Sequence, residues 1–439
     1  MAANSPLTVG WAPPTNLTVG NALRGVPCPA SRRRYPLHGT PRRAFPTDAV
    51  AAATLALKRI VVLVPWVLPL APLCAAERVS LLRVPNGGIQ PQVAVGADGT
   101  VHLIYFHGEP AHGDIDYVRS SATGGEFSAP LRVNRHGGSA IAMGNIRGAH
   151  LALGRDDRVH VAWMGSDRAE PKGPAGKSPM LYTRANDAGD GFEPERNVIG
   201  SHVGLDGGGS LAADREGHVY VAWHAPEVGE QGEDNRRVWV ARSDDDGATF
   251  AAEQAAYDEP TGCCGCCGMR ALADRRGNLY IFYRSAADVA HRDMYLLASS
   301  DRAEKFRGLK LAEWNVDQCV MSTAALTDTT AGVLAAWETE GQVYYGRIDS
   351  KTRKPGRPIA APGGTGKRKH PVVAANERGE VLLAWTEGMG WNQGGSVAWQ
   401  HYDAKGRPVA GTQGQASGVP VWSLPAVYAR PDGGFVVLY

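Results

Sequence analysis

The sequence predicts an all-β fold: a β-propeller built from repeated blades of four short strands. Two observations lead to this prediction. A short apolar strand whose fifth residue is Trp or Tyr recurs seven times, and successive copies start 48 to 60 residues apart. Self-similarity at a fixed period is typical of repeat architectures, and a period of about 50 residues with four short strands is that of a propeller blade.

The repeated strand is the second strand of each blade. Its residues are almost continuously apolar, which indicates a strand that is buried on both faces. The seven copies are residues 101–105, 159–163, 219–223, 279–283, 333–337, 381–385 and 435–439.

Turn signals separate the strands of the hairpins. Asp98-Gly99 and Arg276-Gly277, for example, supply the positive φ that tight hairpin turns need. A third strand follows each hairpin, such as residues 238–242, and a tight turn then leads to a fourth strand.

Seven hairpins predict seven blades, and six blades with an added hairpin are the alternative. The last copy ends at Tyr439 without outer strands, whereas residues 78–84 form a strand without a partner at the start of the domain. Pairing the two would close the ring and remove both sheet edges. We therefore expect an N-terminal strand to close the propeller.

The first 76 residues do not fit the repeat. Residues 1–47 mix Pro, Gly and Arg without apolar periodicity, which indicates disorder, and we interpret residues 1–57 as a disordered or mis-started leader. Residues 58–76 show a basic pair, an apolar run interrupted by prolines, and small residues, the order of a Sec-type signal peptide. Residues 77–439 are then a single propeller domain. We expect it to be exported to the periplasm or the cell exterior, without a stable membrane span after cleavage.

The overall charge argues against two classes of partner. The formal net charge is +2, so the chain as a whole gives no electrostatic reason to bind nucleic acid or an anionic membrane. Only local clusters of charge can therefore select a ligand.

The turn after the third strand carries a family motif. Residues 243–250, Ser-Asp-Asp-Asp-Gly-Ala-Thr-Phe, match the Asp-box pattern S-x-D-x-G-x-T-[FW], and looser copies lie at 120–127, 185–192 and 299–306. In such a turn the aspartate accepts hydrogen bonds, the glycine is left-handed and the aromatic residue packs between sheets. Four copies in phase with the hairpins resemble the sialidase-like (BNR, or Asp-box repeat) propeller superfamily. The motif is structural, so it indicates a superfamily and no particular activity.

The resemblance implies, for an enzyme, an exo-sialidase-like glycoside hydrolase with three substrate-binding arginines, a Tyr–Glu nucleophile pair and an acid/base aspartate. Arg83, followed by Val and Pro, resembles the first arginine, and Asp114, in a Gly-Asp-Ile-Asp segment, resembles the region after the catalytic aspartate. Arg270 is a further weak catalytic candidate. No Glu stands at the head of an inner strand, where the partner of the tyrosine belongs, so the catalytic set is matched only in part.

Residues that lead into the inner strands of a propeller surround one mouth of its channel, where ligands bind. Cationic side chains in these segments predict a mouth that suits a carboxylate, sulfate or phosphate group, and an indole there can stack on a sugar ring. The alternative is that the same residues are solvated rim residues and loop supports. The candidate ligand-binding residues are Arg147, His150, Asp206, Arg270, Arg368, Lys369, His370 and Trp422.

Cys28 lies in the leader and Cys74 in the signal peptide, and all other cysteines lie in two segments of adjacent blades. We expect the two segments to lie at similar heights, so that a disulfide between Cys319 and the other segment is natural in an exported protein. Thiolates with thioethers also suit Cu(I), or Zn if thiolates dominate, and a redox role is a third alternative. The sulfur residues are Cys263, Cys264, Cys266, Cys267, Cys319, Met269 and Met321.

Three functions follow from these features. The first is an exported sialidase-like propeller that binds or hydrolyses an anionic glycan or similar ligand at an arginine-lined mouth. The second is a non-catalytic exported scaffold with a Cu or Zn site at the Cys/Met segments. The third is an interaction module with a disulfide-stapled mouth. The expected partner is a small anionic or carbohydrate ligand, and Cu or Zn is the candidate cofactor.

Overall fold

The computed structural model describes residues 78–121 and 125–439, all of which belong to one compact unit. The expected leader (1–57) and signal peptide (58–76), with Cys28 and Cys74, lie outside the described residues. Three short 3-10 turns occur in the described part, η1 (Pro85–Gly87), η2 (Arg155–Asp157) and η3 (Pro174–Gly176). No helix in this part of the chain is long and apolar enough to cross a membrane.

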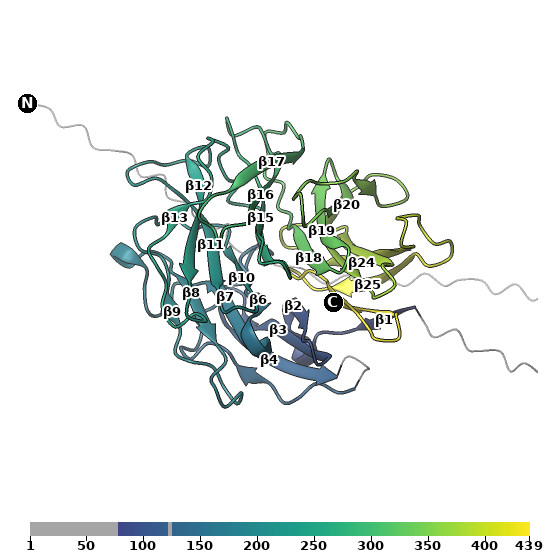
Figure 1. Ribbon diagram of the computed structural model, residues 1–439, viewed down its shortest axis with the longest axis horizontal. Coiled ribbons are helices and arrows are strands. Elements are labelled where there is room, and N and C mark those ends of the chain that lie inside the picture. The colour runs from purple at the N-terminus through teal and green to yellow at the C-terminus, as the bar shows by residue number, and fades with distance from the viewer. Residues whose placement is uncertain (1–77, 122–124) are drawn as a thin grey trace, which may run out of the picture. The chain divides into compact units, whose positions relative to one another are not determined.

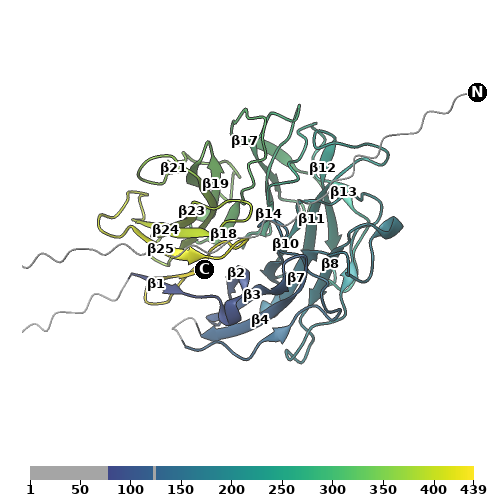
Figure 2. The same ribbon diagram turned by 180° about the vertical axis from the view of Figure 1, so that it is seen from behind.

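Seven β-sheets follow one another in chain order around a ring (Figures 1 and 2). In the first six, four strands pair antiparallel in sequence order from the centre outward. The first blade consists of β2 (Ile89–Val95), β3 (Thr100–Glu109), β4 (His112–Ser121) and β5 (Leu131–Arg132). The second consists of β6 (His150–Leu153), β7 (Val159–Met164), β8 (Met180–Arg184) and β9 (Arg196–Asn197). The third consists of β10 (Gly209–Ala213), β11 (Val219–Pro226), β12 (Arg236–Ser243) and β13 (Gln254–Ala255). The fourth blade consists of β14 (Arg270–Ala273), β15 (Leu279–Arg284), β16 (Met294–Ser299) and β17 (Arg307–Ala312). The fifth consists of β18 (Ala325–Thr329), β19 (Gly332–Thr339), β20 (Gln342–Ile348) and β21 (Ile359–Ala360). The sixth consists of β22 (Arg368–Ala375), β23 (Val381–Glu387), β24 (Gly395–Tyr402) and β25 (Gly414–Val419).

The seventh blade joins the two ends of the described chain. β26 (Ala426–Ala429) and β27 (Phe435–Leu438) form its hairpin, and β1 (Val79–Leu82) pairs parallel with β27 from Val79 opposite Phe435 to Leu82 opposite Leu438. The innermost strand β26 also contacts β2, which completes the ring. The prediction of seven blades closed by an N-terminal strand is confirmed, and the six-blade alternative is wrong.

The hydrophobic core lies between neighbouring blades. The aromatic residue that ends each repeated strand fills this space: Tyr105, Trp163, Trp223 and Tyr283 are all almost completely buried. Burial of one large apolar side chain contributes about 1.5–3 kcal/mol, so each copy of the motif stabilises the contact between two sheets.

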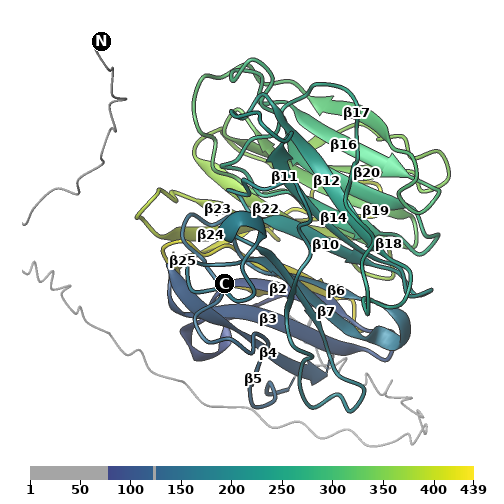
Figure 3. The same cartoon turned by 90° about the vertical axis from the view of Figure 1, so that its left-hand side faces the viewer.

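Antiparallel pairing gives the ring two different faces, which Figure 3 shows from the side. The upper face carries the segments that lead into the inner strands and the loops between second and third strands. The lower face carries the turns between first and second strands and those between third and fourth strands. All the cysteine segments are therefore on the upper face, and the 243–250 turn is on the lower face.

The 243–250 turn is held by its own side chains and packs against the next blade. Thr249 donates from its amide to Oδ1 of Asp245 (2.8 Å) and from its hydroxyl to Oδ2 (2.6 Å). The ring of Phe250 meets Tyr182 of the second blade edge-on, with ring centroids 4.8 Å apart. The turn thus locks the third blade to the second.

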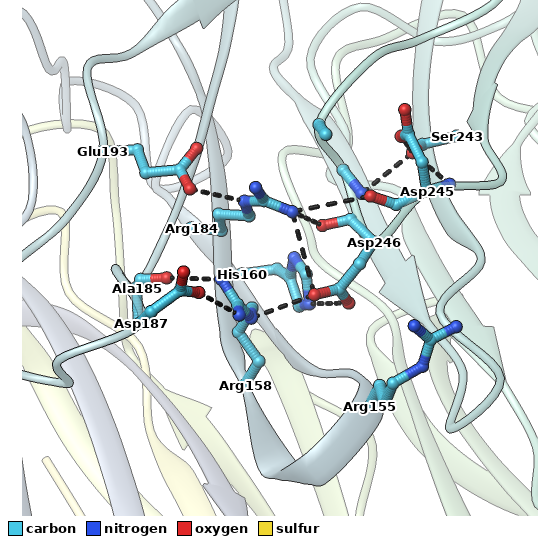
Figure 4. A network of polar contacts seen from close by, with 12 residues as sticks. Arg155, Arg158, His160, Arg184, Ala185, Asp187, Glu193, Ser243, Asp245 and Asp246 are labelled. Carbon is cyan, nitrogen blue, oxygen red and sulfur yellow. Dashed lines mark hydrogen bonds and ion pairs between the residues drawn. The ribbon is translucent and has the colours of Figure 1, made fainter.

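A polar network reinforces this contact between blades (Figure 4). The carboxylate of Asp246 lies 2.9 Å from Nε of Arg158 and 3.7 Å from Nη1 of Arg184, two residues of the second blade. Nε2 of the buried His160 is 3.5 Å from the same carboxylate. Apolar packing and ion pairs therefore act at the same blade boundary.

Candidate functional site

Three cysteines converge on the upper face of the fourth blade, in the segment that leads into β14. The Sγ atoms of Cys264, Cys266 and Cys267 lie within 4.8 Å of one another, and those of Cys264 and Cys266 are 3.3 Å apart. Cys264 and Cys267 are buried, whereas Cys266 is partly exposed. We call these three residues the cysteine triad. Three sulfurs at this spacing can bind one metal ion together.

Local hydrogen bonds fix the chain that carries the triad. The amide of Cys264 donates to the carbonyl of Arg284 (2.9 Å), and the amide of Gly265 donates to Oε1 of Glu233 (2.7 Å). A Cβ on Gly265 would displace the guanidinium of Arg236, so the glycine lets the backbone approach this side chain closely. The segment is thereby attached to both the third and the fourth blade.

The three thiols of the triad hold their protons unequally. Hydrogen bonds from Cys264 and Cys267, and from the amide of Met321, lower the pKa of Cys266 to about 4 although burial opposes this shift. The bond to Cys266 raises the pKa of Cys264, and burial raises that of Cys267. The free triad therefore holds one thiolate and two thiols, and a metal ion would displace the two remaining protons.

The triad belongs to a cluster of apolar side chains. Ala286 and Val320 are buried against Cys264 and Cys267, and Trp314 packs beside them. An apolar shell limits access of water and strengthens the bonds between a metal ion and thiolates.

Charged side chains lie around this apolar cluster. Nη1 of Arg292 lies 2.7 Å from Oε2 of Glu233, and Nη1 of Arg236 lies 3.4 Å from its Oε1. Nη2 of Arg284 is 3.5 Å from Oε2 of Glu338, and both of these side chains are almost fully buried. Burial raises the pKa of Glu338 to about 7, although Arg284 lowers it. Three guanidinium groups near the triad favour the negative charge of bound thiolates.

The other predicted sulfur residues lie apart from the triad. Cys263 and Met269 are buried in the core between the third and fourth blades. Cys319 is exposed, and all five cysteines among the described residues are free thiols, so the expected disulfide to Cys319 is not formed in the structure. Met321 is partly exposed, and its amide reaches Cys266.

A small cavity lies beside Met321, the residue whose amide reaches Cys266. Its volume is about 20 Å³, and its lining includes Met321, His370, Met389 and Trp391. The side chain of Trp391 is 47% exposed, so the cavity lies near the surface. Met389 and Trp391 could not be predicted as neighbours of this site, because the 388–394 loop carries no motif.

The predicted cations of the mouth are engaged within the protein. Arg147 donates from Nη2 to Oδ1 of Asp206 (2.9 Å), and Arg368 donates to Oε1 of Glu387 (3.1 Å) and is buried. Nζ of Lys369 donates to a backbone carbonyl. These contacts match the alternative in which such residues support loops.

His370 and Trp422 belong to the layer that covers the upper end of the channel. Nε2 of His370 is 3.3 Å from Nδ2 of Asn145, and burial lowers the pKa of His370 to about 3, so this ring is neutral. The carbonyl of Trp422 accepts a hydrogen bond from Nε2 of Gln90 (2.8 Å).

Arg270 differs from the other predicted cations. It forms no ion pair with any carboxylate of the described residues, and Nη1 donates to Nδ1 of His150 (3.1 Å). Ser210 lies 2.9 Å from the same nitrogen, and its hydroxyl accepts the amide of Ala271 (2.8 Å). Burial lowers the pKa of Arg270 to about 10 and keeps His150 neutral by lowering its pKa well below the usual value. The inner strands β6, β10 and β14 thus place His150, Ser210 and Arg270 side by side.

The remaining catalytic candidates make separate contacts. Arg83 donates to the carbonyls of Gly418 (2.5 Å) and Ser417 (3.0 Å) in β25, and its guanidinium lies 4.0 Å from the centre of the Tyr439 ring. Asp114 accepts the amide of Gly138 (2.7 Å) within the first blade. The contacts of Arg83, Asp114 and Arg270 have no residue in common.

Sequence reasoning missed the charged residues around the triad. Arg284 and Glu338 each follow directly after the aromatic residue of a repeated strand, at a position that is apolar, His or Thr in the first, second, third and sixth copies. A charge at the end of such a buried strand is the signal that would have indicated them.

No protein-family model matches the sequence, and no curated protein matches it. Among solved structures, a protein of unknown function from Dyadobacter fermentans is 15% identical, covers 71% of this chain and 94% of its own, and has a TM-score of 0.48. An α-L-arabinanase from Penicillium chrysogenum in complex with arabinobiose is 11% identical (74% and 95% covered, TM-score 0.46). A Hadza microbial sialidase is 14% identical (73% and 69% covered, TM-score 0.40). All three TM-scores are below 0.5, so these similarities assign no function to this chain.

Proposed function

We propose that this protein binds a soft metal ion, Cu(I) in first place, at the cysteine triad. The observation that carries the proposal is the convergence of three Sγ atoms within 4.8 Å on one partly exposed site. Soft thiolates favour Cu(I) and Zn(II), and a structural Zn(II) ion takes four protein ligands. A set of three cysteines therefore suits Cu(I) better, and Zn is the alternative.

The charges around the triad support this proposal. Cu(I) with three thiolates carries a net charge of −2, which is unfavourable among apolar side chains unless cations lie nearby. Three guanidinium groups lie around the triad, those of Arg284, Arg292 and Arg236. Burial raises the pKa of Glu338, the neighbour of Arg284, to about 7, so this carboxyl group can be protonated near neutral pH. The surroundings thus favour an anionic complex.

A titration under reducing, anaerobic conditions tests the proposal. Cu(I) is added to the purified chain in competition with a chromophoric chelator such as bicinchoninate, and bound copper is counted by elemental analysis. We expect one Cu(I) per chain, lost in a variant with Cys264, Cys266 and Cys267 all replaced by Ser. The exposed Cys319→Ser variant is the matched control and should keep the ion. Unchanged binding in the triple variant, or no stoichiometric Cu(I) or Zn(II) in the natural chain, overturns the proposal.

A second candidate function is the binding of an anionic carbohydrate at the upper mouth. Trp391 is exposed there, and a Cβ built on Gly144 would lie 3.2 Å from its indole and 2.9 Å from Nη1 of Arg147. An exposed indole beside a guanidinium suits a sugar ring that bears a carboxylate. Quenching of tryptophan fluorescence by sialic acid or uronate oligosaccharides, with Trp391→Ala as the variant, tests it. A fluorogenic sialoside assay decides whether the chain also hydrolyses such a ligand; the absence of quenching by any of them would exclude this candidate.

We also propose that the chain belongs to the sialidase-like Asp-box superfamily. Two turns support this proposal. In the 299–306 turn, Ser299 donates to Oδ1 of Asp301 (2.8 Å) and the amide of Lys305 donates to the same oxygen (3.0 Å). The 243–250 turn has the same arrangement around its aspartate. Hydrogen bonds of this kind are expected of an Asp box.

We further propose that the protein is exported and acts in the periplasm or outside the cell. The support is the basic, apolar and small-residue order of residues 58–76. Terminal sequencing of the exported protein should give Glu77 as the first residue. A chain that remains in the cytoplasm with these residues attached would contradict the proposal.

A further inference from the structure

The centre of the ring contains a cavity separate from the cysteine triad. Its volume is about 380 Å³, and all seven inner strands contribute to its lining. Each inner strand is the last strand of its sheet, so only one of its edges is paired and the other faces the channel. The labels of β2, β10, β14 and β18 lie around this centre in Figure 2. Unpaired edges place backbone N–H donors along the channel wall.

Arg270 lies at the deep end of this cavity. It is one of the residues that line the cavity, and its guanidinium forms no ion pair with the carboxylates of the described residues. Its only protein partner among the described residues is the neutral His150, whose Nδ1 accepts from Nη1, and Nε is buried without a partner. Because a guanidinium does not lose its proton in proteins, this group remains a partly buried cation without an ion-pair partner among the described residues.

The upper end of the channel is closed above Arg270. Gln90 donates from Nε2 to the carbonyls of Ala142 (2.6 Å) and Trp422 (2.8 Å), and Asn145 donates to the carbonyl of Ser423 (2.9 Å). Between this layer and Arg270 lies only a cavity of about 20 Å³, the size of one water molecule. A ligand therefore has to reach Arg270 from the lower face.

The lower mouth of the cavity carries both signs of charge. Arg275 and Asp328 form an ion pair (2.9 Å), and Asp157 accepts the amide of Ala97. Arg215 also lines the cavity; it is exposed and forms no ion pair in the described part of the chain. The charges along this path that have no ion-pair partner among the described residues are Arg215 and Asp157 at the mouth and Arg270 at the end.

We propose that the channel cavity binds a small oxyanion, such as phosphate, sulfate or a carboxylate group, with the Arg270 guanidinium as its main contact. His150 is a positioning residue: by accepting from Nη1 it holds the guanidinium plane and leaves Nη2 for the ligand. Edge N–H groups of the inner strands complete the shell, as backbone amides do in other anion sites. Arg215 raises the local anion concentration at the mouth. This site does not depend on the metal proposed above.

Calorimetric titration of the purified full chain with inorganic phosphate, sulfate and acetate at low ionic strength tests this inference. Binding of at least one of these probes at one site per chain is expected, and Arg270→Gln should weaken it about tenfold or more because a charge-assisted contact is lost. Arg407→Gln, which removes an exposed guanidinium that pairs with Asp403 and does not line the cavity, is the matched control and should leave binding unchanged. Arg215→Gln should weaken binding less, and its effect should disappear at high salt.

Two outcomes overturn the inference: none of the three anions binds, or binding survives Arg270→Gln. If that variant does not fold, crystals of the natural chain soaked in selenate give the answer, because a selenium peak beside Arg270 is expected and its absence from the channel contradicts the site. The triple cysteine variant should bind the anion normally, so failure of the metal proposal leaves this test intact.

Discussion

The Sγ atoms of Cys264 and Cys266 lie 3.3 Å apart, although only Gly265 separates the two residues in the chain. In an extended strand, residues two apart are about 6.6 Å apart along the chain and point to the same side. The backbone therefore bends at Gly265 and brings two sulfurs, together with that of Cys267, to one point. This local geometry is the basis of the metal site proposed here.

The first prediction concerns the reactivity of the metal-free triad. Cys266 is partly exposed, and its pKa of about 4 keeps it as a thiolate at neutral pH, whereas the pKa values of Cys264 and Cys267 are raised. Iodoacetamide at pH 6 should therefore alkylate Cys266 more than about tenfold faster than either of the other two. Peptide mass mapping measures the three rates. Added Cu(I) should protect Cys266 and leave the exposed Cys319 reactive; equal rates within the triad would contradict the assignment.

The second prediction concerns the 243–250 turn. Burial raises the pKa of Asp245, but the hydrogen bonds from Thr249 and Ser243 outweigh it and lower the pKa to about 2. Asp245→Ala should lower the free energy of unfolding by about 1–2 kcal/mol, the usual effect of losing such bonds. Asp244→Ala, on the same turn but largely exposed, should change it by less than about 0.5 kcal/mol.

The same aspartate gives a dependence on pH with a definite sign. A carboxyl whose pKa is lower in the folded state stabilises the fold above its unfolded value of 3.8, and this stabilisation is lost as pH falls towards 2. Denaturant unfolding between pH 2 and 4 should therefore show a smaller loss of stability in Asp245→Ala than in the natural chain. Identical slopes would exclude this role of the carboxylate.

The third prediction concerns the buried pair of Arg284 and Glu338. Burial raises the pKa of Glu338 from 4.5 to about 7, so the folded chain holds this proton more tightly than the unfolded chain. Stability should accordingly be highest below pH 4.5 with respect to this group and fall as pH rises to 7, by roughly 3 kcal/mol at most. Glu338→Gln should flatten this part of the stability profile. The exposed Glu340→Gln is the control, and an unchanged slope in Glu338→Gln would contradict the shift.

The fourth prediction concerns the closing strand. Val79 is buried between the sixth and seventh blades, whereas Leu81 on the same strand is 40% exposed. Val79→Ala should destabilise the fold by about 1–3 kcal/mol, and Leu81→Ala by less than about 0.5 kcal/mol. Urea unfolding of both variants measures the difference. Equal effects would show that β1 contributes little to closure of the ring.

The fold could be predicted from the sequence because its main signal is local and repeated. Trp163 and Trp223 are the fifth residues of repeated second strands, and both side chains are buried between sheets. Every blade needs an aromatic residue at this position for the same reason, so the signal recurs around the ring. The closing strand was predictable for a related reason. A closed ring of blades leaves no free sheet edge, so residues 78–84 had to pair with the last hairpin.

The site could be predicted only in part, because it depends on which side chains meet across blades. The sequence indicated the cysteine segment, but adjacent residues point apart, and only the structure separates the buried Cys263 from the triad. The predicted positive mouth shows the same limit. Arg147 and Arg270 have the same charge and similar positions in their blades, yet Asp206 pairs with the first and no described carboxylate pairs with the second.

X-ray absorption at the copper K edge shows directly whether the cysteine triad holds a Cu(I) ion. The measurement uses the reduced chain loaded with one equivalent of Cu(I), with Cys266→Ser as the comparison. Three sulfur ligands are expected in the natural chain, and a loss of sulfur coordination is expected in the variant. Copper coordinated by nitrogen and oxygen alone, or the same sulfur count in both proteins, would contradict this site.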